Sequence, residues 1–149
     1  MQRTFSNRAL ALVSAMVLSV VAAASWSQGI IWLGTLGGSV SQATAVSADG
    51  SVVVGWTVNA SGQTRAFRWT QATGMQDLGT LGGSVSQAWG VSADGLVIVG
   101  ETTNASGQTR AFRWTQATGM QDLGTLGGAP GRAFGVSADG SAVVGWTVN

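Results

Sequence analysis

The chain has 149 residues, of which 23 are glycine and 9% are charged, and it contains no cysteine, histidine, tyrosine or lysine. These absences exclude thiolate and imidazole metal sites, Ser-His-Asp and Cys-His catalysis, and lysine-based covalent catalysis. The formal net charge is +1, but Arg3 and Arg8 lie in the first eight residues. Residues 25–149 therefore carry five arginines and six acids, a balance of 5 − 6 = −1, with no basic patch for nucleic acid. We expect a protein that is not an enzyme and binds no cofactor, metal or nucleic acid.

The N-terminal segment, residues 1–24, has the pattern of a helical signal peptide. Two arginines are followed by an unbroken run of small and apolar residues over 9–24, which ends in three alanines. This run of 24 − 9 + 1 = 16 residues is shorter than the roughly 20 that a membrane-spanning helix needs. We expect export to the extracellular space, cell surface or periplasm, with no stable membrane span after cleavage. An uncleaved anchor is the alternative.

The repeat domain, residues 25–149, contains three copies of one sequence. Repeat one, 33–77, and repeat two, 78–122, are identical at 39 of 45 positions, and a truncated repeat three covers 123–149. Residues 29–32 align with the end of each repeat and predict a lone strand. Copies this similar are expected to occupy equivalent environments in a stack or ring.

Each repeat is predicted to contain four short strands, which in repeat one span Ala43–Ser47, Ser51–Trp56, Arg65–Thr70 and Met75–Leu81. An Asp-Gly pair between the first two favours a tight turn. The valine-rich second segment is typical of a strand buried on both faces, and the third alternates between two faces. Four antiparallel strands in about 45 residues match one blade of a β-propeller. We therefore predict an all-β fold, a partial β-propeller-like array, with a β-solenoid as the alternative.

The repeated strings also resemble a known family. The segments LGTLGGS, SADGS, RAFRWT and GMQDLGTLGG, taken together, resemble the HAF-type extracellular repeat of bacteria, and the resemblance covers everything after the signal peptide. The triplets Arg65-Ala66-Phe67 and Arg110-Ala111-Phe112 stand where the family name places a His-Ala-Phe-like triplet. The resemblance implies a secreted or surface-exposed repeat array, often within long chains that include an autotransporter barrel. It supplies no catalytic residue and no ligand.

These observations predict a non-catalytic exported module with a structural, adhesive or ligand-binding role at a surface. One alternative is a fragment of a longer autotransporter-type repeat protein with no independent activity, and a less favoured one is a glycan-acting propeller enzyme. Because the sequence stops within a repeat, it is expected to be a truncated piece, a self-assembling unit or an open array. The expected partners are a glycan or surface ligand, and the chain itself or further repeats through open strand edges.

Two sets of residues form the candidate ligand surface. Trp56 and Trp146 share a repeat position with Glu101, and a position that accepts both tryptophan and glutamate is expected to be at least partly exposed. The other set consists of arginines beside phenylalanine and tryptophan on the third strand of each repeat: Arg65, Arg68, Arg110 and Arg113. An arginine and aromatic surface can stack on sugars or bind anions. The favoured interpretation is structural, with the aromatic rings packed between repeats and the arginines paired with acids such as Asp77 or Asp122.

Asp49, Asp94 and Asp139 recur in the sequence Ser-Ala-Asp-Gly. We predict that each carboxylate accepts a backbone N–H within its turn. A calcium site needs several oxygen ligands, and each turn supplies only one acid, so no metal is expected.

Overall fold

The computed structural model describes residues 29–149, so the predicted signal peptide lies outside the described residues. Residues 31–149 form one compact unit whose regular elements are all strands. In chain order these are β1 (Gly37–Val46), β2 (Val53–Asn59), β3 (Thr64–Thr70), β4 (Gly74–Asp77), β5 (Gly82–Val91), β6 (Ile98–Asn104), β7 (Thr109–Thr115), β8 (Gly119–Asp122), β9 (Gly131–Val136) and β10 (Val143–Thr147).

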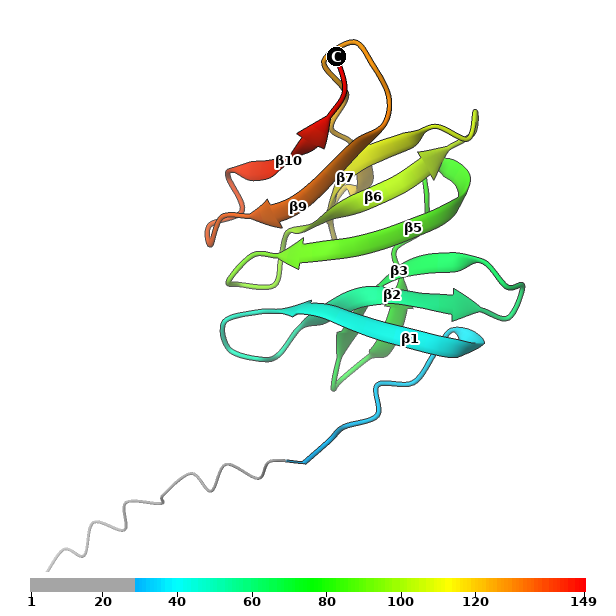
Figure 1. The fold of residues 1–149 in the computed structure, drawn as a ribbon. Coiled ribbons are helices and arrows are strands. Elements are labelled where there is room, and N and C mark those ends of the chain that lie inside the picture. Colours follow the sequence, from blue (N-terminus) through cyan, green and yellow to red (C-terminus); the bar gives the residue numbers. More distant parts are fainter. Residues whose placement is uncertain (1–28) are drawn as a thin grey trace, which may run out of the picture. The chain divides into compact units, whose positions relative to one another are not determined.

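The strands form three separate antiparallel sheets, one for each repeat (Figure 1). Sheet one has the order β1-β2-β3-β4, sheet two has the order β5-β6-β7-β8, and sheet three pairs β9 with β10. Strand pairing joins neighbours in sequence, and none of the three sheets closes on itself. The all-β fold and the four strands of each complete repeat are confirmed.

The first strand of each complete repeat is longer than predicted, and its pairing with the second strand is irregular. β1 begins at Gly37 and pairs with β2 from Gly37↔Asn59 to Val46↔Val53, with two register shifts. The second shift leaves Thr44 without a paired residue, as expected for a β-bulge. Gly55 sits opposite this bend, where a Cβ would lie only 2.0 Å from the Gln42 carbonyl oxygen. Glycine is therefore required at this position for the strands to approach each other.

The predicted lone strand at residues 29–32 is not a strand in the structure. Its counterpart in repeat one, β4, pairs with β3, the strand that precedes it. Residues 29–32 pair with no strand among the described residues, and the apolar side chains of Ile31 and Trp32 are exposed.

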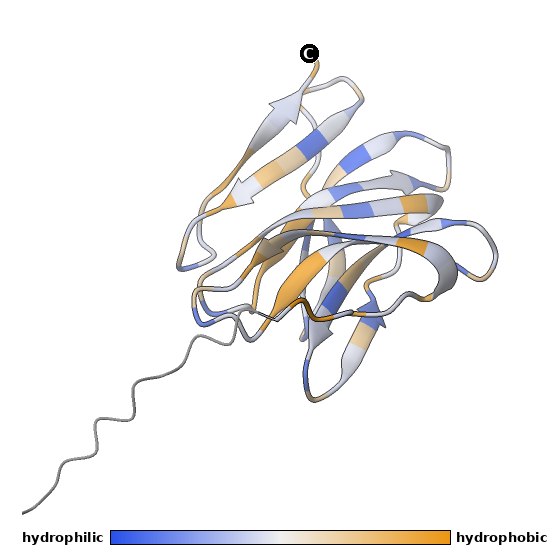
Figure 2. Ribbon diagram, turned by 60° about the horizontal axis from the view of Figure 1, so that its bottom comes forward, coloured by the Kyte–Doolittle hydropathy of each residue, from blue (hydrophilic) through white to orange (hydrophobic). Residues whose placement is uncertain are grey.

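Successive sheets pack through the first strand of the following repeat. β5 contacts β1, β2 and β3, and β9 contacts β5, β6 and β7. The main core joins repeats one and two, where Val54 and Ala66 pack with Ala88, Phe112 and other buried residues. A smaller core joins repeats two and three around Val99 and Ala133. In Figure 2 the strongly apolar residues occur in short stretches of the strands rather than along their whole length.

Polar contacts fix the same packing. The Ser86 hydroxyl, fully buried on β5, accepts the Ala66 N–H at 2.9 Å and donates to the Gly79 carbonyl at 2.6 Å. The Ala48 amide donates to the Ala93 carbonyl, and the Ala93 amide donates to the Ala138 carbonyl, each at 3.0 Å. The Ser-Ala-Asp-Gly turns of all three repeats are therefore joined in one column by backbone hydrogen bonds.

Candidate functional site

The Ser-Ala-Asp-Gly turns confirm the structural role predicted for the aspartates. The Asp49 carboxylate accepts the Ser47 hydroxyl at 2.7 Å and the Ser51 amide at 3.0 Å, and the Ser47 hydroxyl in turn accepts the Val52 amide. Gly50, with φ of +74°, donates its amide to the Ser47 carbonyl. Positive φ is confined to glycine throughout the described residues, so Asp49 itself stays in ordinary backbone geometry.

These hydrogen bonds stabilise the ionised form of each turn aspartate. The Ser47 hydroxyl, followed by the Ser51 amide and hydroxyl, lowers the pKa of Asp49 to about 2. The Ser137 hydroxyl, with further bonds from Ser141, lowers the pKa of Asp139 to about 2. The pKa of Asp94 is also lowered, first by the Ser92 hydroxyl and then by the Leu96 amide. Carboxylates held ionised in this way are poor proton donors at neutral pH.

The four candidate arginines divide into two pairs with different surroundings. Arg65 Nε lies 3.8 Å from Asp77 Oδ2, and Arg110 Nε lies 3.1 Å from Asp122 Oδ2. Each of these aspartates also accepts the amide of the glycine two residues later, at 2.8 Å. Arg65 and Arg110 therefore have the structural role that the sequence favoured, in which an acid on the neighbouring strand pairs with the guanidinium.

Arg68 and Arg113 have no ion-pair partner among residues 29–149 and meet at one pocket. This pocket has a volume of about 450 Å³ and is lined mainly by repeat two, with Arg68 from repeat one and Asp139 from repeat three. Asp94 and Asp139 lie on its polar side, and Leu96, Val97 and Trp114 contribute apolar surface. Two guanidinium groups and two ionised carboxylates balance in charge. Such a pocket can both donate hydrogen bonds to and accept them from a polar, uncharged ligand.

The aromatic rings beside these arginines belong mostly to the core. Phe67 and Phe112 are fully buried and Trp114 is nearly so, while Trp69 is half-buried. Phe112 and Trp114 pack with residues of both complete repeats. The prediction that these aromatics pack between repeats is confirmed for this pair, and only the small exposed part of Trp114 remains at the pocket that Arg68 and Arg113 line.

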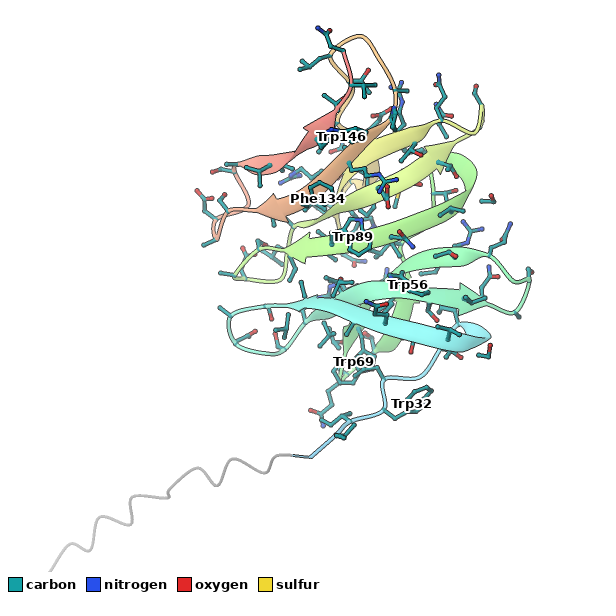
Figure 3. The ribbon with its side chains drawn as sticks, viewed as in Figure 1. Trp32, Trp56, Trp69, Trp89, Phe134 and Trp146 are labelled. Atoms are coloured by element: carbon teal, nitrogen blue, oxygen red, sulfur yellow. The ribbon has the colours of Figure 1, made fainter. Side chains whose placement is uncertain are left out.

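The repeat position shared by Trp56, Glu101 and Trp146 differs in burial from copy to copy. Trp56 is half-buried, Trp146 is half-exposed, and Glu101 is buried. Figure 3 labels the two tryptophans. The prediction of partial exposure holds for the two tryptophans and is wrong for Glu101. Arg132 Nε, on the following repeat, lies 2.8 Å from Glu101 Oε2 and neutralises the buried charge. Glu101 and Arg132 both differ from the residues at the same positions of the other repeats, and the two differences introduce opposite charges. This is the signal by which the sequence could have indicated the pair.

A second pocket, of about 360 Å³, lies between repeats two and three. Trp146, Arg132 and Val143 line it from sheet three, the turn around Thr125 lines it from the start of repeat three, and Ala111 lines it from repeat two. Gly131 lies in this pocket, at the position that Ser86 occupies one repeat earlier. Trp146 and Trp56 are on different sheets, so the structure does not bring the two candidate tryptophans together.

The described residues show neither a metal centre nor a membrane-spanning helix. Residues 29–149 contain no group of three or more acidic side chains that could hold a metal ion. The same part of the chain has no helix long and apolar enough to cross a membrane. Comparison with known proteins finds no matching family model, no matching curated protein and no matching solved structure.

Proposed function

We propose that this chain is a non-catalytic, exported repeat module that contacts a ligand or a surface outside the cytoplasm. The observation that carries the proposal is that all six acidic residues of the described chain have structural partners. Three aspartates stabilise turns, two pair with arginines on the adjacent strand, and Glu101 pairs with Arg132. Carboxylates held in this way leave no free acid and base pair for hydrolysis. Export is inferred from the signal-peptide pattern of residues 1–24.

We also propose that the three sheets are blades of a partial β-propeller-like array of the HAF type. Support comes from the antiparallel order of the sheets, the 45-residue period and the RAFRWT and SADG strings. The face-to-face contact of each sheet with the first strand of the next is consistent with blades around an axis.

The ligand site in this proposal is the pocket that holds Arg68 and Arg113, and its ligand class is a neutral glycan. Sugar hydroxyls both donate and accept hydrogen bonds, which suits two free guanidinium groups beside two carboxylates. An anionic ligand gains little there, because the aspartates offset the arginine charge.

The test is binding of neutral oligosaccharides and matched sulfated oligosaccharides to the purified chain, measured by calorimetry. The expected result is saturable binding of a neutral sugar that Arg113→Gln weakens about tenfold or more, as loss of a charged hydrogen bond predicts. Ser106→Ala, at an exposed turn outside the pocket, is the matched control and should leave binding unchanged. Binding that is equal in both variants, or that depends only on sulfation, would contradict this assignment.

A further inference from the structure

One face of sheet three is apolar and uncovered, although the equivalent faces of the other sheets are covered. Val144 is 65% exposed, whereas its counterparts Val54 and Val99 are both 0% exposed. Phe134 and Trp146 lie on the same terminal sheet and are each about half exposed (Figure 3). The three side chains form what we call the trailing face.

The two junctions within the chain show which element covers the equivalent face of sheets one and two. Sheet one is covered by β5, which buries Ala88 against Val54, and sheet two is covered by β9, which buries Ala133 against Val99. At the bulge of β1, the Thr44 hydroxyl reaches across to donate to the Ala88 carbonyl at 2.7 Å. In both cases the covering element is the first strand of a following repeat.

β1 is also the first strand of a repeat, and it covers no preceding sheet among residues 29–149. Residues 41–43 of β1 read Ser-Gln-Ala and are identical to residues 86–88 of β5. Ala43 is exposed, whereas Ala88 and Ala133 are almost fully buried against the preceding sheet. We call Ser41 and Ala43, which alternate onto the same side of β1, the leading face.

The hydrogen-bonded column of turns is also unfinished at both ends. The Ala138 amide has no acceptor among the described residues, and the Ala48 carbonyl has no donor among them. Both residues are exposed. Within the chain, the amide at this position donates to the carbonyl at the same position of the next repeat, as Ala48 does to Ala93. The Ala138 amide and the Ala48 carbonyl are the donor and the acceptor of one more such hydrogen bond.

We propose that the trailing face binds the leading face of a second copy of this chain, so that copies stack head to tail. The resulting junction reproduces the one between repeats one and two. Val144 and Trp146 repeat the residues Val54 and Trp56, and the incoming β1 is identical to β5 except at Thr44 and Ala45, where β5 has Trp89 and Gly90. The Ala138 amide donates to the Ala48 carbonyl of the second copy and continues the column.

This junction is expected to be weaker than those within the chain. β3 and β7 contribute to the internal junctions, and sheet three has only two strands, so the stacking surface is smaller. The interface uses two different surfaces of one chain and is therefore heterologous, which allows further copies to add. The inference goes beyond the proposed function, because it requires no ligand.

Light scattering with size-exclusion chromatography of the full chain, over a range of protein concentrations, tests the proposal. Wild-type protein should associate reversibly. Val144→Arg and Ala43→Arg each place a charge in one face and should raise the concentration needed for association at least about tenfold. Ser106→Arg, at an exposed turn residue outside both faces and outside the ligand pocket, is the matched control and should associate like the wild type. Circular dichroism of each variant confirms that the fold is retained.

Mixing the two face variants gives the decisive measurement. Val144→Arg keeps an intact leading face and Ala43→Arg keeps an intact trailing face, so the mixture should form a 1:1 dimer and nothing larger. A wild-type monomer at every concentration would overturn the proposal. So would association that either face variant leaves unchanged, an equal loss in Ser106→Arg, or a mixture that remains monomeric.

Discussion

Replacing Ser86 with alanine tests how one buried hydroxyl joins two repeats. The side chain is fully buried, accepts the Ala66 amide at 2.9 Å and donates to the Gly79 carbonyl at 2.6 Å. Alanine removes both hydrogen bonds and leaves the buried Ala66 N–H and the half-buried Gly79 C=O without this partner. The orphaned N–H costs about 1–3 kcal/mol and the half-buried carbonyl about 1 kcal/mol, so Ser86→Ala should lower the free energy of unfolding by about 2–4 kcal/mol. Urea denaturation followed by circular dichroism and tryptophan fluorescence measures this change.

Two equivalent positions in the same chain provide the controls. Ser41 occupies the same repeat position without a preceding sheet, so Ser41→Ala should change stability by less than about 0.5 kcal/mol. Repeat three has Gly131 there, and a Cβ at that residue would lie 3.5 Å from the Ala111 nitrogen and 3.7 Å from the Gly124 oxygen. Gly131→Ser should therefore restore the hydroxyl bridge and exceed Gly131→Ala in stability by about 1 kcal/mol. The reasoning fails if Ser86→Ala and Ser41→Ala have the same effect, or if serine and alanine at 131 are equivalent.

Three further predictions concern the turns and the buried ion pair. Serine hydroxyls lower the pKa of Asp139 from 3.8 to about 2, so its stabilisation is complete above about pH 4 and is lost as the pH falls toward 2. The urea midpoint of the wild type should fall more steeply across this window than that of Asp139→Asn. At Gly95 φ is +71°, and the Cβ added by Gly95→Ala would lie 2.5 Å from a valine methyl on the preceding repeat. Gly107 has a similar φ, but a Cβ added there would meet open space. Gly95→Ala should cost at least about 1 kcal/mol more by urea denaturation, and equal costs would contradict a packing role for that turn. Arg132→Met strands the buried Glu101 carboxylate and should cost about 2 kcal/mol, a loss that Glu101→Gln in the same chain should largely reverse in a double-mutant cycle.

The features that could be predicted from the sequence are those decided within a single repeat. The Asp-Gly pairs placed the hairpin turns, and the carboxylate hydrogen bonds of Asp49 follow from its position in the turn. The pairing of Arg65 with Asp77 also follows from the order of strands, because neighbours in sequence pair in the sheet. These interactions span few residues, so identical sequences produce them wherever the repeat stands.

Burial is the property that only the tertiary structure decided. Val54 and Val144 occupy the same repeat position, and one is fully buried while the other is largely exposed. The convergence of Arg68 and Arg113 on one pocket similarly depends on two sheets meeting. Sequence pattern fixes which face of a strand is apolar, but the free energy of burying that face is gained only where another sheet covers it. For this reason equal repeats differ in their core, their buried charge and their accessible surface.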